Sequence, residues 1–315
     1  PGFLLWAAFP PMGERMDCLF ALAPLMWLSR REVSAGIVAK RWFQSGIFYW
    51  VATLSWMPAI VKNGGPWPLV VLGWFALAAY CTAYFAAYGY LSAAYWRWVR
   101  SSTSESCLLR LLGILIVEPV LWCGLELIRS RFGGGFAWNQ LGVVPANSGF
   151  GTPAAIGGVY LLSAIVILIN GSIAGIVERM IRRGKTSRWR SLETILVFAV
   201  VFAVYKSSAL WTAHADSTSL KVALVQRNFP CCFKSADENP WVAYSNLVVN
   251  VGFMKPDLVV LPESAMSEFG LIESQRAERF AARLRRLTGA QAVVAGGTRA
   301  QGRKGPIFNS AAIYE

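Results

Sequence analysis

One carboxylate lies just after a predicted strand, at the end of the strand where open α/β sheets place their reactive groups. The stretch Asp257 to Leu261 is short, apolar and rich in β-branched residues, which predicts a buried strand. Pro262 cannot continue a central ladder, so Glu263 falls just beyond the carboxyl end of this strand, where open α/β sheets gather their chemistry. Glu263 is therefore our candidate general base. A solvated loop residue is the alternative.

The cysteine and histidine content argues against a metal centre. None of the six cysteines shows metal-ligand spacing, and the only histidine is His214, which follows the last apolar run. Those in apolar runs, Cys18, Cys81 and Cys123, are predicted to be small buried hydrophobes. For the adjacent Cys231 and Cys232, a redox role and an exposed bystander role are both open. We expect no metal and no cofactor.

The composition predicts a membrane domain joined to a soluble one. Of the 315 residues 55% are hydrophobic and only 15% are charged, and the mean hydropathy is +0.45. Soluble domains are far less apolar. Long apolar runs occupy residues 1–213, and ordinary globular patterning occupies residues 219–315. We expect a polytopic helical membrane domain followed by an α/β domain.

About seven apolar runs are predicted to be membrane spans. They lie at 1–9, 17–28, 42–61, 67–95, 108–128, 152–177 and 192–211. One set of alternate loops holds most of the basic residues, among them Arg30, Arg31, Lys40 and Arg41, and the positive-inside rule places that set in the cytoplasm. Everything after the last span then lies outside the cytoplasm. The net charge of +13 is a topology signal, and no nucleic-acid partner is needed to explain it.

Two carboxylates lie inside the predicted spans. Glu118 is in the middle of its run, and Glu126 precedes Arg129 by one helical turn, a spacing that lets the two side chains pair. Intramembrane carboxylates are candidates for function, whereas an ion pair that packs helices is the structural alternative.

The predicted external loop at 133–142 is rich in glycine and contains Phe136 and Trp138. Such a loop is suited to dip into the membrane interface and contact lipid. Aromatic residues at this level are also routine membrane anchors. We assign Phe136 and Trp138 to substrate binding, with anchoring as the alternative.

The soluble part alternates predicted strands and helices. A strand at 220–226 precedes a helix that starts at Asn239-Pro240 and ends near Gly252. The strand at 257–261 is followed by an amphipathic helix at 271–287, and strands at 292–297 and 307–314 complete a β-α-β-α-β-β order. The apolar residues recurring along the second helix are Ala277, Phe280, Leu284 and Leu287.

This order, with a glutamate directly after the second strand, resembles the first half of the nitrilase (carbon–nitrogen hydrolase) fold, whose members use a Glu-Lys-Cys triad. Carried outside the cytoplasm on membrane spans, it resembles the bacterial apolipoprotein N-acyltransferases in particular. The matching stretches are Phe9-Pro10-Pro11, Leu121-Trp122 with Glu126 and Arg129, Gly135 to Gly142, Val225-Gln226 with Asn228, Leu261 to Ser264, and Asn309 to Ala311.

The resemblance implies a two-step acyl transfer in the bacterial inner membrane. A cysteine thiolate takes a fatty acyl group from a membrane phospholipid as a thioester, and the α-amine of a diacylglyceryl-cysteine apolipoprotein then takes it over. Glu263 matches the family's base. Asn309 joins Phe136 and Trp138 as an expected substrate-binding residue.

The sequence departs from the family pattern at its end. The family's lysine and cysteine fall later than the strand containing Asn309, and this chain ends at Glu315. Lys304, Cys231 and Cys232 do not occupy the matching places, and the family's final span is missing. We therefore expect the gene to continue and the chain as given to be inactive. A membrane-tethered nitrilase-type amidase and a non-catalytic lipid-binding or partner-binding protein are the alternative functions.

Overall fold

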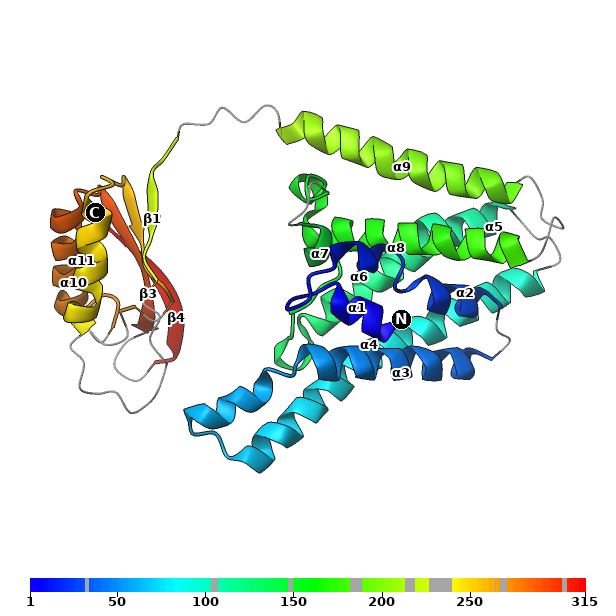
Figure 1. The fold of residues 1–315 in the computed structure, drawn as a ribbon, viewed down its shortest axis with the longest axis horizontal. Helices are drawn as coiled ribbons and strands as arrows, with labels where there is room; N and C mark the ends of the chain where they lie inside the picture. Colours follow the sequence, from blue (N-terminus) through cyan, green and yellow to red (C-terminus); the bar gives the residue numbers. More distant parts are fainter. Residues whose placement is uncertain are drawn as a thin grey trace. The chain divides into compact units, whose positions relative to one another are not determined.

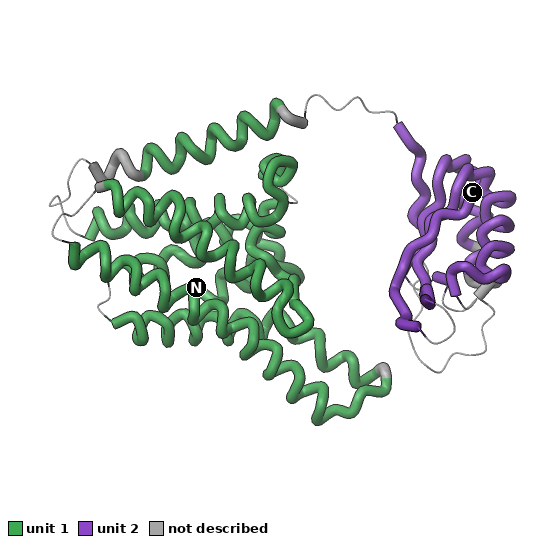
Figure 2. The backbone as a smooth tube through the Cα atoms, turned by 180° about the vertical axis from the view of Figure 1, so that it is seen from behind, with its two compact units in different colours: residues 1–215 green, residues 216–315 purple. Residues whose placement is uncertain are grey.

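The computed structural model describes residues 1–31, 34–102, 107–146, 150–181, 189–212, 219–226, 240–263, 265–266, 271–301 and 305–315. The expectations for His214, Asn228, Cys231, Cys232, Ser264 and Lys304 lie outside these residues. The chain forms two compact units, Pro1–Ala215 and Asp216–Glu315, which Figure 2 draws in green and purple.

The first unit is built from helices. Its elements are α1 (Gly2–Ala7), η1 (Arg15–Leu19), α2 (Ala23–Arg31), α3 (Ala35–Thr53), η2 (Met57–Asn63), α4 (Trp67–Ser101), α5 (Cys107–Leu112), the π-helical turn η3 (Gly113–Val117), α6 (Glu118–Arg129), η4 (Phe132–Gly134), α7 (Val143–Ala146), α8 (Ala154–Ile181) and α9 (Trp189–Thr212). Figure 1 shows the long helices running side by side. Among the described residues, three stretches are long and apolar enough to cross a membrane: Trp67–Ser101, Leu108–Arg129 and Ala154–Ile181.

These three stretches coincide with the spans predicted at 67–95, 108–128 and 152–177. Within α9, Thr194–Leu210 is a shorter apolar stretch. The run predicted at 1–9 forms the short helix α1, and the run predicted at 17–28 is divided between η1 and α2.

The bounds predicted for a span at 42–61 are wrong. The helix α3 begins at Ala35, because the Ser34 hydroxyl caps it by accepting a hydrogen bond from the Ile37 N–H (3.5 Å). It runs through Lys40 and Arg41, whose side chains are not buried, and ends at Thr53. The rest of the apolar run forms the separate turn η2.

Aromatic side chains fill the core of the first unit. Trp42 is fully buried and meets Tyr88 edge to face, with ring centroids 4.8 Å apart. The two helices approach closely here because α4 has no side chain at Gly89, where a Cβ would lie 2.3 Å from the Trp42 ring. Tyr49 and Phe85 stack in the same cluster. This core fixes α3 and α4 against α6.

The second unit contains a four-stranded sheet. Its elements are β1 (Val222–Leu224), α10 (Pro240–Gly252), β2 (Leu258–Val260), α11 (Gln275–Thr288), β3 (Ala292–Ala300) and β4 (Ile307–Tyr314). The strand order is β1-β2-β3-β4; β1, β2 and β3 are parallel, and β4 is antiparallel to β3. Figure 1 shows α10 and α11 together on one face of the sheet. The predicted β-α-β-α-β-β order is confirmed.

The bounds of the second predicted helix need one correction. The helix α11 begins at Gln275, four residues later than predicted, because the Ser274 hydroxyl accepts a hydrogen bond from the Ala277 N–H (3.2 Å). It ends at Thr288, and Gly289, whose φ is +71°, forms a left-handed cap. Of the four apolar residues expected to form the buried face of this helix, Ala277, Phe280 and Leu284 are buried. The expectation is wrong at Leu287, which is 45% exposed.

Candidate functional site

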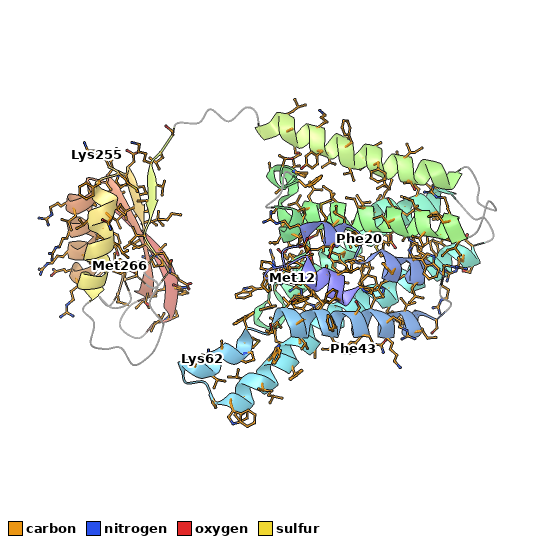
Figure 3. The ribbon with its side chains drawn as sticks, viewed as in Figure 1. Met12, Phe20, Phe43, Lys62, Lys255 and Met266 are labelled. Atoms are coloured by element: carbon orange, nitrogen blue, oxygen red, sulfur yellow. The ribbon has the colours of Figure 1, made fainter. Side chains whose placement is uncertain are left out.

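Glu263 lies in a tight turn that is bonded to the neighbouring strand. Three backbone hydrogen bonds hold this turn: Leu261 N–H to the Val294 carbonyl (2.8 Å), Ala265 N–H to the Pro262 carbonyl (3.1 Å), and Met266 N–H to the Gly296 carbonyl (3.0 Å). Met266, labelled in Figure 3, is fully buried, whereas Glu263 is exposed. The turn is therefore anchored on both sides of a carboxylate that is open to solvent.

The turn rests directly on the backbone of β3. A Cβ added at Gly296 would lie 2.2 Å from the Glu263 carbonyl oxygen and 2.5 Å from the Glu263 Cα, so no larger residue fits without moving the turn. Gly296 is opposite Ala311 in β4. The glycine thus sets the distance between the turn that holds Glu263 and the sheet.

We expect Gly296→Ala to loosen the turn. The added methyl overpacks the contact, which typically costs about 1–3 kcal/mol, and the hydrogen bond from the Met266 N–H weakens as the turn moves. Hydrogen exchange of the peptide that contains Glu263 and Met266 should become at least about fivefold faster. Ala311→Ser, on the opposite exposed position, is the control and should change nothing. Unchanged exchange in Gly296→Ala would show that the turn has room to adapt.

The strand β4 brings a second polar side chain to the carboxylate. Asn309 pairs with Thr298 of β3, and its Nδ2 donates a hydrogen bond to Glu263 Oε1. A carboxylate accepts at two oxygens, so Glu263 can hold the amide with one oxygen and take a proton with the other. The structure brings Glu263 and Asn309 together, and this arrangement is suited to general base chemistry.

In the first unit, a buried arginine holds the glycine-rich loop. Arg129 is 3% exposed, and its Nη1 donates to the carbonyls of Phe136 (2.8 Å) and Trp138 (2.9 Å). Its guanidinium lies over the Trp50 ring, 4.9 Å from the centroid. One cation therefore fixes the backbone at both predicted substrate-binding residues of the loop.

Glu126 anchors the far end of the same loop. It is 6% exposed, and its Oε1 accepts a hydrogen bond from the Leu141 N–H (2.8 Å). The ion pair that the helical spacing allows between Glu126 and Arg129 does not form; each side chain binds loop backbone instead. The spacing rule considers only one helix face, whereas here the loop folds back over the end of α6 and supplies better partners.

The anchored loop displays a stack of aromatic rings. Trp138 stacks on Trp56 of the α3–η2 connection, with centroids 5.3 Å apart, and on Phe136 at 5.8 Å. Phe136 in turn meets Trp50 edge to face. Trp138 is 55% exposed and Trp56 is 45% exposed, so this surface is apolar and open. It is suited to contact an acyl chain or the membrane interface.

Glu118 has a different environment from Glu126. Its Oε2 pairs with Arg30 Nη2 at 2.6 Å, and its Oε1 accepts from Trp96 Nε1 at 2.9 Å. Arg30 Nη1 also donates to the Gly171 carbonyl (2.7 Å), so the group joins α2, α4, α6 and α8. We predicted Arg30 to be a cytoplasmic loop cation; it lies in the last turn of α2 and is only 8% exposed. The structural alternative, an ion pair that packs helices, therefore describes Glu118.

Comparison with known proteins shows the family to which this chain is similar. The family described as the apolipoprotein N-acyltransferase N-terminal domain matches residues 1–172, more than half of the chain. The apolipoprotein N-acyltransferase of Geobacter metallireducens is 28% identical over 289 residues, which are 88% of this chain and 52% of that protein. That of Neisseria meningitidis is 27% identical over 225 residues, 70% of this chain and 40% of that protein. The Photobacterium profundum protein is 24% identical over 274 residues, 84% of this chain and 48% of that protein. The chain spans about half the length of the curated relatives it matches.

Proposed function

The chain belongs to the apolipoprotein N-acyltransferase family, and from this premise we propose that its gene product N-acylates lipoproteins. The reaction moves a fatty acyl group from a membrane phospholipid to the N-terminal α-amine of a diacylglyceryl-cysteine apolipoprotein, through a thioester on the enzyme. The setting is the bacterial inner membrane. About seven spans carry the second unit on the periplasmic side, and this unit is the first half of a nitrilase-like sandwich.

Glu263 is the general base of both steps in this proposal. In the first step it takes the proton of a cysteine thiol, and the thiolate attacks the ester carbonyl of the phospholipid. The lysophospholipid then leaves as an alcohol, with the proton that Glu263 returns to its alkoxide oxygen. In the second step Glu263 takes a proton from the lipoprotein α-amine, which attacks the thioester and releases the thiolate. The observation that carries the proposal is the exposed Glu263 carboxylate, held by Asn309 at the end of β2.

The aromatic surface at Trp138 binds lipid in the same proposal. Donor and acceptor are both anchored in the membrane, so an enzyme acting on them benefits from an apolar platform on its membrane unit. Arg129 and Glu126 position that platform, because they bind the backbone on both sides of Trp138. An amidase acting on small soluble molecules would not need it.

The proposal is tested by the product that forms on a lipoprotein. The gene that carries this sequence would be expressed in a bacterium depleted of its own N-acyltransferase, and the N-terminal peptide of a test lipoprotein would be analysed by mass spectrometry. We expect the mass of one additional acyl chain and the loss of the free α-amine. A free amine together with hydrolysis of small amides would favour the amidase, and neither activity would favour the binding protein.

We expect Trp138→Ala to lower the rate of lipoprotein acylation by about tenfold, which corresponds to ~1.4 kcal/mol, in the range of an aromatic contact. Trp98→Ala is the matched control, because Trp98 is also 55% exposed but lies on α4. The rates of both variants would be measured in membranes with the same lipoprotein. Equal rates in the two variants and the unmodified protein would argue that Trp138 is only an interfacial anchor.

A further inference from the structure

A large apolar cavity lies between α8 and α9, apart from the residues used above. Its volume is about 480 Å³, and its walls include Ile165 and Ile169 of α8 and Phe198 and Phe202 of α9. This volume is within the range of 300–1,000 Å³ that is typical of ligand sites. Its lining is almost wholly apolar. The ligand must therefore be largely hydrocarbon.

The surroundings of the cavity indicate where that hydrocarbon comes from. The helix α8 is long and apolar enough to cross a membrane, and the described part of α9 is apolar as well. Phe198 and Phe202 are 51% and 63% exposed, which in a bilayer places them against lipid. An acyl chain can enter the cavity from the side without crossing water.

One cation lies at the cavity near the end of α9. Lys206 lines the cavity, and its Nζ is 5.6 Å from the centroid of the Phe202 ring. It lies about 9 Å along the helix before Thr212, the last residue of α9. A long side chain at this distance can reach a membrane interface at the end of the helix. A lysine at that level attracts anionic headgroups.

We propose that the space between α8 and α9 is a binding site for one anionic glycerophospholipid. An acyl chain occupies the apolar cavity, and the headgroup phosphate lies against the Lys206 ammonium. The bound lipid completes the packing of α9 against α8. This inference depends on the membrane setting of the first unit but not on acyl transfer, so the two proposals can fail separately.

The test compares two lipids with the same acyl chains on the full chain purified in detergent. Native mass spectrometry would follow titration with phosphatidylglycerol, which is anionic, or phosphatidylcholine, which is zwitterionic. We expect one phosphatidylglycerol to be retained about fivefold more strongly than phosphatidylcholine, the factor for ~1 kcal/mol per lysine near an anionic lipid. Equal retention of the two lipids would overturn the proposal.

Two variants and two controls locate the site. Lys206→Gln should abolish the preference for phosphatidylglycerol, whereas Lys62→Gln, on η2 (Figure 3), should keep it. Val201→Trp fills the cavity and should lower retention of both lipids at least about tenfold, whereas Ile195→Trp, a 62% exposed position that does not line the cavity, should not. If Val201→Trp fails to fold, Lys206→Gln still tests the site, because Lys206 is exposed and its replacement does not disturb the packing.

Two results would overturn the site. In the first, the Lys206→Gln variant still prefers phosphatidylglycerol. In the second, Lys62→Gln removes the preference as fully as Lys206→Gln does. Acylation of a lipoprotein by the same gene product would be measured in parallel. Acylation without the lipid preference would remove this inference alone, and the lipid preference without acylation would remove the proposed function alone.

Discussion

Glu263→Gln is expected to lower lipoprotein acylation by about 10²- to 10⁴-fold, the usual contribution of a general base. Glutamine keeps the shape of the side chain and the Oε1 that accepts the hydrogen bond from Asn309, so the turn stays in place. It loses the negative charge and, with it, the ability to take up a proton. Because Glu263 is exposed, the free energy of unfolding should change by no more than about 0.5 kcal/mol. The measurement is kcat/KM for a lipoprotein acceptor in membranes that contain the gene product.

Glu273→Gln provides the matched control in the same unit. Glu273 is also an exposed carboxylate, and its ion pair with Arg299 (2.7 Å) is on the surface, where such pairs contribute little. We expect unchanged acylation in this variant. If Glu263→Gln keeps more than half of the activity, Glu263 is a solvated loop residue and the general base must be sought elsewhere.

Sequence patterns located the strands and helices of the second unit, because these elements follow local rules. The proline at position 262 ends β2 and puts Glu263 beyond it, and the change from twofold to helical periodicity marks each element. The partner of Glu263 was not predictable in the same way. Asn309 reaches it only because β4 turns back antiparallel to β3, a register that brings together two residues 46 positions apart.

The first unit was harder to predict because its important contacts are long-range. Hydropathy located three of the spans, but it assigned Arg30 to a cytoplasmic loop, since the positive-inside rule counts charges and ignores their partners. Glu118, the partner of Arg30, is 88 residues away. The role of Arg129 was missed for a related reason. Its hydrogen-bond acceptors are main-chain carbonyls of the loop, and the pattern of side chains along a sequence carries no information about main-chain groups.

Arg30→Met is expected to destabilise the first unit by about 3–5 kcal/mol, the usual cost of removing one partner of a buried ion pair. Glu118 is 1% exposed, so without Arg30 its negative charge is buried without a cation. The Trp96 indole N–H is then its closest hydrogen-bond donor. Inside a membrane no water is at hand to replace the lost partner. The measurement is the free energy of unfolding of the full chain in mixed micelles. Arg31→Met is the control, because Arg31 is exposed and its stacking on Trp27 should contribute at most about 1 kcal/mol.

A double variant separates the effect of charge from the effect of packing. Combining Arg30→Met with Glu118→Met removes both charges of this pair, so neither is left buried without the other. The Trp96 N–H and the Gly171 carbonyl then lose their partners, which should cost about 1–3 kcal/mol each. We therefore expect the double variant to be more stable than Arg30→Met alone and less stable than the original chain. Equal instability of the single and double variants would instead show that the Arg30 guanidinium, whose central carbon lies 5.0 Å from the centroid of the Trp96 ring, stabilises this junction of four helices mainly by packing on the indole.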